Sequence, residues 1–148
     1  MAKFVFRLQS YLGVKEQLEE QKKNEYATAL RCLEEERQKK RILEQELAEN
    51  VTLFKKALRT TIEPAGIRRY NNRIELLKVW IIEQEERIKR AEQYAEEKRL
   101  ELVEAMKERK ALETVKERSY EEYLNEEKKA EQALVDGIVS YRYAVSGR

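Results

Sequence analysis

The spacing of hydrophobic residues along the chain divides it into two helical stretches with one interruption between them. After Gly66, one series of mainly apolar residues recurs every seven positions, and a companion series follows three positions on. This spacing is that of a coiled-coil seam, so it predicts one long helix over about 67–143. The two series are Ile67, Ile74, Ile81, Ile88, Ala95 and Leu102, and Tyr70, Leu77, Gln84, Ala91, Lys98, Ala105 and Leu112. The phase of the pattern slips after the last of these, which changes supercoiling but need not break the helix.

The first part of the chain has the same periodicity in a weaker form, which predicts a helix over about 3–59. One heptad position holds Tyr26, Leu33, Leu47 and Phe54, and the other holds Leu30, Val51 and Leu58. Between them, Arg37 and Lys40 fall on the expected seam. The seam at that point is therefore either open or crossed by salt bridges.

The interruption over about 60–66 contains the only proline of the chain, Pro64, and one of four glycines, Gly66. Proline lacks an amide donor and disfavours helix at the residue before it, and glycine tolerates backbone angles that other residues avoid. We therefore expect a reversal, which makes the chain an all-α protein: a single antiparallel coiled-coil hairpin over 1–148. Phe54 should then meet the region of Tyr70. The alternative is one long kinked helix that dimerises in parallel.

The two arms of such a hairpin are unequal, because about 23 residues at the end of the second helix would have no partner within the chain. This overhang carries apolar residues, among them Leu134, Ile138 and Tyr141. A lone helix with an apolar face is marginal in water and is a common binding device. The overhang therefore either frays, pairs with another copy, or is received by another protein. Trp80, on the flank of the seam, either covers the seam or contacts a partner.

Composition supports a coiled coil and offers no catalytic chemistry. Charged residues make up 41% of the chain, yet basic and acidic residues nearly balance, at 31 and 29. Histidine is absent and Cys32 is the only cysteine, so the usual triads and metal clusters are not expected, nor is any cofactor. The longest charge-free stretch is far too short to span a bilayer, and no signal peptide is evident, which predicts a cytoplasmic protein.

An RNA-binding arm is a third function class. The segment "GIRRYNNR" combines Arg68, Arg69 and Arg73 with Tyr70, and arginine and aromatic side chains can stack on bases. The balanced charge elsewhere favours a protein partner instead.

Three stretches of the chain resemble the FliJ family, a small soluble component of the flagellar type III export apparatus. They are the opening "KFVFRLQSYLGVKEQLEEQKKNE", the central "IRRYNNRIELLKVWIIEQEERI" and the late "ERSYEEYLNEEKKAEQALVDGIVSYRY". The resemblance spans nearly the whole chain. It implies an antiparallel two-helix coiled coil similar to the central stalk of rotary ATPases.

The resemblance also implies partners. They are the hexameric flagellar export ATPase, the export gate protein FlhA and export chaperones, which would bring the chain to the cytoplasmic face of the membrane. The residues expected to contact the ATPase ring are Phe4, Phe6, Leu8, Leu124, Leu134, Ile138 and Tyr141. Those expected to contact the gate are Tyr70, Leu77, Trp80 and Gln84. The expected role is a non-catalytic coupling component; the alternative is a scaffolding coiled coil that homodimerises.

Overall fold

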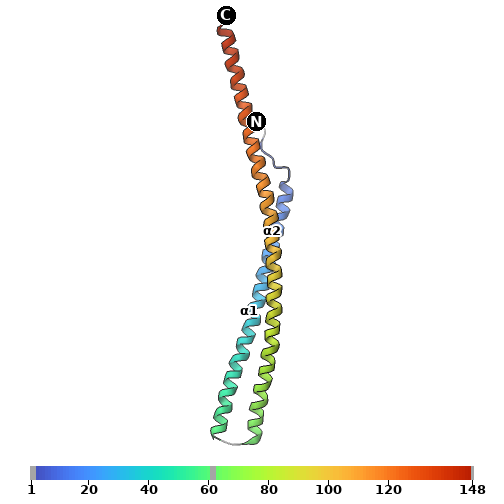
Figure 1. The fold of residues 1–148 in the computed structure, drawn as a ribbon, viewed down its shortest axis with the longest axis vertical. Coiled ribbons are helices and arrows are strands. Elements are labelled where there is room, and N and C mark those ends of the chain that lie inside the picture. The colour runs from blue at the N-terminus through green and yellow to red at the C-terminus, as the bar shows by residue number, and fades with distance from the viewer. Residues whose placement is uncertain (1–2, 61–62, 148) are drawn as a thin grey trace. The chain divides into compact units, whose positions relative to one another are not determined.

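The computed structural model describes residues 3–60 and 63–147, and all regular structure in these residues is helical. Helix α1 spans Gln9–Thr60 and helix α2 spans Pro64–Ser146. The two helices pack against each other, so the all-α hairpin predicted from the heptad pattern is confirmed (Figure 1). Both helices of the pair come from one chain, whereas in a parallel dimer of one kinked helix they would come from two chains.

Helix α1 begins later than the sequence indicated. Residues 3–6 have no regular structure, and the amide of Gln9 donates to the carbonyl of Phe6 at 3.1 Å before the first helical bond, from Leu12 to Leu8 at 2.9 Å. Phe6 is only 7% exposed. The helix expected from about residue 3 is therefore wrong for residues 3–8: Phe6 is buried from a segment without regular structure.

Helix α2 begins earlier than expected, at Pro64 rather than near residue 67. The carbonyl of Glu63 accepts the amide of Ile67 at 3.2 Å, which closes the first turn. Proline suits this first position, because its missing donor would be unpaired there in any case and its φ is already helical. No described residue has a positive φ, so Gly66 lies in the helix and does not make the reversal. Two residues of the expected turn, 61 and 62, lie outside the described residues.

The described chain forms two compact units, one of which consists of residues 21–103. In this unit α1 and α2 run antiparallel, and the rings of Phe54 and Tyr70 lie 6.5 Å apart, as the expected register requires. The predicted seam of α2 is confirmed here, since none of its residues is exposed. The most deeply buried apolar residues of the unit are Ala29, Leu33, Ile74, Leu77 and Ala95.

The predicted seam of α1 needs a correction. Leu30 and Leu58 are 42% and 45% exposed, whereas Ala29 is only 1% exposed. Alanine has no side chain beyond Cβ, so α2 can approach α1 closely over Ala29, and the larger Leu30 is left on the flank. The heptad positions were assigned from the large apolar residues, so the small core residue Ala29 was not predicted.

Ion pairs cross the charged stretch of α1, which decides between the two expectations for it. Arg37 pairs with Glu92 at 3.4 Å and Lys40 pairs with Glu85 at 3.4 Å. The seam is therefore crossed by salt bridges at this level. Such partly exposed ion pairs contribute only about 0–1 kcal/mol each to the free energy of folding. They therefore affect the register between the two helices more than the stability of the hairpin.

The other unit combines residues 3–20 with residues 104–147, of which 104–146 belong to α2. Its buried apolar residues are Phe6, Leu12 and Ala105. Lys15 pairs with Glu108 at 2.8 Å, and Glu19 pairs with Arg109. Helix α2 continues to Ser146, so the phase slip after Leu112 does not interrupt it, as predicted.

Candidate functional site

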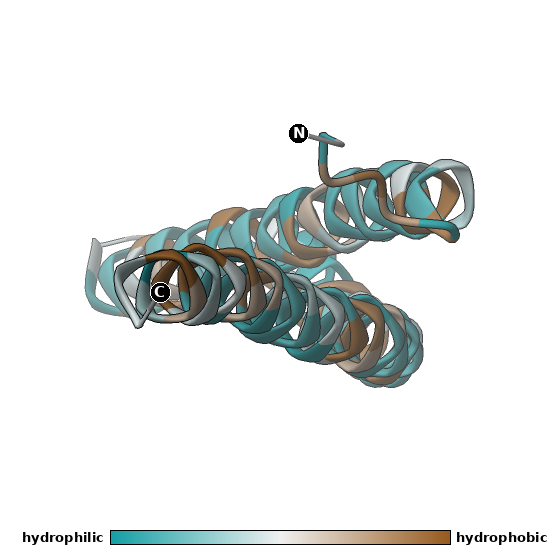
Figure 2. Ribbon diagram, turned by 90° about the horizontal axis from the view of Figure 1, so that it is seen from above, coloured by the Kyte–Doolittle hydropathy of each residue, from teal (hydrophilic) through white to brown (hydrophobic). Residues whose placement is uncertain are grey.

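The last part of α2 presents a completely exposed helix. Every residue from 128 to 147 is exposed. Leu134, Ile138 and Tyr141 are 67%, 49% and 71% exposed, and Leu124 is 40% exposed. Spacings of four and three residues place the first three on one face of the helix. Figure 2 shows that the helix at the carboxyl terminus carries both hydrophobic and hydrophilic residues. Four of the predicted ring-contact residues are therefore accessible.

The three predicted contact residues near the amino terminus are placed differently from one another. Leu8 is 40% exposed, Phe4 is half-buried and Phe6 is buried. The ring of Phe4 lies 5.2 Å from that of Tyr120 and 5.4 Å from that of Tyr123. Aromatic pairs at such distances contribute about 0.5–1.5 kcal/mol beyond burial. Phe4 and Phe6 thus hold the segment before α1 on α2, and Leu8 is the exposed member of the three.

The predicted gate-contact residues divide into two surface residues and two core residues. Leu77 is 0% exposed and Gln84 is 4% exposed. Their heptad positions face α1, so they form part of the packing and not of an accessible surface. Tyr70 and Trp80 are half-buried, and they are the members of this group that another protein could touch.

Trp80 is held by a cation–π contact. The guanidinium of Arg73 lies 5.2 Å from the centre of the indole ring and also pairs with Glu46 of α1 at 3.3 Å. Leu43 and Gln84 lie beside the indole around a small groove. Trp80 therefore both covers the seam, through these neighbours, and keeps part of its ring accessible.

Among the described residues, Gln84 is the buried polar residue of the core, and it makes two hydrogen bonds to Glu36. Its Nε2 donates to the main-chain carbonyl of Glu36 at 2.9 Å and also to the carboxylate. The bond to the carboxylate lowers the pKa of Glu36 below its usual value, against a smaller effect of burial. A buried amide satisfied in this way disfavours other registers, because any shift would leave it unpaired.

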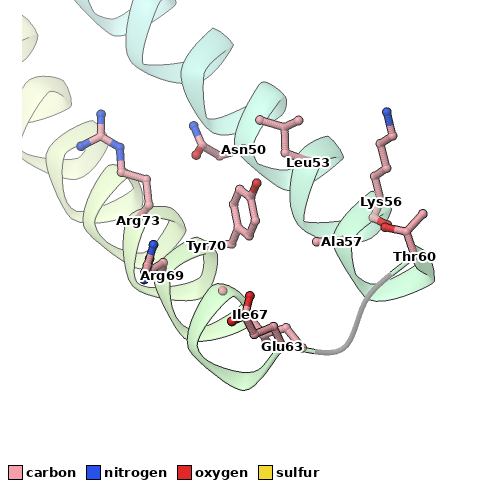
Figure 3. Close-up of a pocket in the computed structure, with 11 residues that line it drawn as sticks. Asn50, Leu53, Lys56, Ala57, Thr60, Glu63, Ile67, Arg69, Tyr70 and Arg73 are labelled. Atoms are coloured by element: carbon pink, nitrogen blue, oxygen red, sulfur yellow. The ribbon is translucent and has the colours of Figure 1, made fainter.

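A groove lies between the two helices at the loop end of the unit of residues 21–103 (Figure 3), and the sequence pattern did not reveal it. Its volume is about 610 Å³. The side chain of Tyr70 points across it from α2 toward Asn50 and Leu53 of α1. Basic residues from both helices line it, because the hairpin brings the end of α1 beside the start of α2. The lining residues are Asn50, Leu53, Lys56, Ala57, Thr60, Glu63, Gly66, Ile67, Arg69, Tyr70 and Arg73.

Within residues 3–60 and 63–147, no group of His, Cys, Asp and Glu side chains is arranged to hold a metal ion. Neither described helix contains a stretch apolar enough to cross a membrane.

The fold and its exposed surfaces define a helical-hairpin protein whose accessible features are an uncovered helix end, a partly exposed tryptophan and a basic groove. The model of the flagellar FliJ protein family matches residues 4–148, essentially the whole chain. The chain therefore belongs to the FliJ family, which makes it a component of the flagellar export apparatus. No individual curated protein and no solved structure matches it.

Proposed function

We propose that this chain is a non-catalytic coupling component of the flagellar export apparatus, located at the cytoplasmic face of the membrane through its partners. It binds the hexameric export ATPase in the manner of a rotary-ATPase central stalk, and it contacts the gate protein FlhA and export chaperones. The family match supports a role in flagellar export. The observation that carries the ATPase contact is the fully exposed end of α2, residues 128–147.

The exposed helix end supplies what a ring would recognise. Leu134, Ile138 and Tyr141 form an apolar stripe that nothing in the described chain covers, and burying it in a partner is favourable by about 25 cal/mol per Å². A helix pair inserted into a ring of six subunits favours the assembled ring if it binds that state more tightly than free subunits.

The gate contact is assigned to Tyr70 and Trp80, the accessible members of the predicted set. If gate and ATPase bind different parts of this chain, the effect of one on binding of the other must be reciprocal. ATP turnover and gate activation would then be linked without any chemistry on this chain.

The test uses ATPase hexamer formation and ATP turnover, measured with the cognate enzyme. A chain cut after Glu127 should fail to stimulate either, and so should the triple change Leu134→Ser, Ile138→Ser and Tyr141→Ser. Unchanged stimulation by both variants would remove the ring contact.

A matched control lies on the same helix. Val135, Val139 and Tyr143 are 51%, 59% and 81% exposed, and each lies about 60° or more around the helix from the nearest residue of the stripe. Their change to serine removes a similar apolar area and should preserve stimulation. Equal loss in both triple variants would show that the stripe is not the specific contact.

The gate contact is tested separately by binding to the cytoplasmic part of FlhA. Trp80→Ala should weaken this binding and leave ATPase stimulation intact. If the chain instead functions as a homodimeric scaffold, sizing should give a stable dimer, and neither partner should respond to these changes.

A further inference from the structure

The loop end of the hairpin holds a concentration of positive charge. We call residues 50–60 and 63–73 the tip. The tip has six basic residues and one acidic residue, Glu63. The whole chain has 31 basic and 29 acidic residues, so 25 basic and 28 acidic residues lie outside the tip. The tip is therefore strongly basic, and the rest of the chain is slightly acidic. The six are Lys55, Lys56, Arg59, Arg68, Arg69 and Arg73.

Most of this charge is not neutralised within the described chain. Arg73 pairs with Glu46 at 3.3 Å. The other five basic residues are exposed, and none makes an ion pair with a carboxylate of the described residues. Farther from the loop, by contrast, basic residues of the seam pair across it, as Lys40 does with Glu85 at 3.4 Å. A cluster of unpaired cations beside a groove attracts an anionic partner.

The groove between the helices gives this charge a shaped binding surface. Leu53 and Ala57 from α1 and Ile67 and Tyr70 from α2 supply apolar surface. Lys56 and Arg69 stand on opposite sides of it, one from each helix. Figure 3 shows Tyr70 between the two helices, with Arg69 near its base on α2 and Lys56 farther along α1, its ammonium pointing away from the ring. The surface is thus apolar at its centre and cationic on both margins.

We propose that this groove binds an amphipathic helix of a protein partner whose polar residues are acidic. Helices commonly dock their apolar face into a groove of this kind. Apolar side chains of the partner would cover Leu53 and Ile67, and its carboxylates would reach Lys56 and Arg69. The phosphates of RNA or of lipid headgroups would match the charge but not the aliphatic surface of Leu53 and Ile67. The groove shares Tyr70 with the proposed gate contact, whereas its cations Lys56 and Arg69 lie outside that set.

The experiment measures binding of labelled synthetic peptides to the full chain by fluorescence anisotropy. Two amphipathic helical peptides of about 18 residues, five turns, share one leucine face and carry either glutamate or glutamine on the other. The acidic peptide should bind about tenfold more tightly than the glutamine peptide, and its affinity should fall as salt rises from about 0.05 to 0.3 M.

Two variants of the chain locate the site. Changing Lys56, Arg68 and Arg69 to glutamate should weaken binding of the acidic peptide about tenfold or more. Changing Leu53 to serine should weaken binding of both peptides, because it removes apolar surface that they share. Circular dichroism at 222 nm establishes that each variant keeps its helices.

A charge-matched control separates the groove from net charge. Lys23, Arg31 and Lys89 are exposed and make no ion pair within the described residues, and their change to glutamate alters net charge by the same amount. This control should leave binding within about twofold, which is under ~0.5 kcal/mol. Equal losses in both triple variants, or no binding of the acidic peptide at low salt, would overturn the proposal. Tighter binding of single-stranded RNA or phosphatidylserine vesicles, lost on the same tip changes, would overturn it in favour of that class.

Discussion

The side-chain amide of Gln84 donates a hydrogen bond to the main-chain carbonyl of Glu36 at 2.9 Å, across the seam between α2 and α1. Gln84 is 4% exposed and lies in a series of otherwise mainly apolar heptad positions. Burying an amide is costly unless it is paired. The pair therefore contributes less to the free energy of folding than to the choice of one register.

Replacing Gln84 separates these two contributions. Gln84→Leu fills the same space without a polar group and should raise the free energy of unfolding by about 1 kcal/mol. Gln84→Ala leaves a cavity and should lower it by about 1–2 kcal/mol. Urea unfolding followed at 222 nm measures both. A leucine variant less stable than the alanine variant would contradict this account of the core.

The carboxylates that pair across the hairpin predict sensitivity to acid. Hydrogen bonds from Lys22, at 3.2 Å, and Lys98, at 3.3 Å, lower the pKa of Glu101 from its usual 4.5, and the bond from Gln84 lowers that of Glu36. A pKa lowered on folding gives stability that is present above pH 4.5 and is lost as the pH falls through the folded value. The melting temperature should therefore fall as the pH drops below about 4.5.

Glu101→Gln should reduce that dependence, because the variant has one fewer such carboxylate to protonate. Glu97 is exposed and makes no ion pair within the described residues, so Glu97→Gln is the matched control. Melting curves recorded between pH 7 and pH 3 compare the three chains. Identical pH profiles for wild type and Glu101→Gln would show that the ion pairs of Glu101 do not contribute to the acid sensitivity.

The packing of the segment before α1 should depend on one buried ring. Phe6 is 7% exposed and its neighbour Val5 is 80% exposed. Truncation of a buried phenylalanine costs about 3–5 kcal/mol, so Phe6→Ala should release the segment and speed tryptic cleavage after Arg7. Val5→Ala should leave the cleavage rate unchanged, and equal rates in both variants would contradict the packing of Phe6.

Close approach of the helices over Ala29 gives a test of core size. Ala29 is 1% exposed, whereas Ala27, two residues earlier, is exposed. Ala29→Leu forces extra atoms into a filled space and should destabilise the chain by about 1–3 kcal/mol. Ala27→Leu, which adds the same atoms on the solvent side, should change stability by less than about 0.5 kcal/mol. Thermal unfolding of the two variants distinguishes the sites.

Heptad spacing predicted the parts of the fold that depend on repeated contacts. It predicted the seam of α2 from Ile67 to Leu112, because the same contact recurs at every heptad. It also predicted the pairing of Phe54 with Tyr70, because the register of neighbouring heptads fixes that contact. Single local events were less predictable. The start of α2 at Pro64 depends on one residue's fixed φ, and the same proline is equally consistent with a turn.

The candidate surfaces could be predicted where the residues have no helix packed against them, and not where the residues lie between the two helices. The exposed apolar residues after Leu124 follow from the unequal lengths of the two helices. Leu77 and Gln84 were assigned to a surface, yet their heptad positions place them in the core. The sequence showed the arginines near the bend but not the groove, because Lys56 and Arg69 belong to different helices and only the reversal brings them to one site.

The ion pairs of the two units also imply an order of events during synthesis. Glu46 and Arg73 are 27 residues apart in the chain, whereas Lys15 and Glu108 are 93 apart. Closing a short loop loses less entropy than closing a long one, so the hairpin should zip from its bend toward its ends. On the ribosome, the amino-terminal segment would be synthesised long before the part of α2 that it packs against. During that interval its aromatic rings would be exposed and accessible to chaperones.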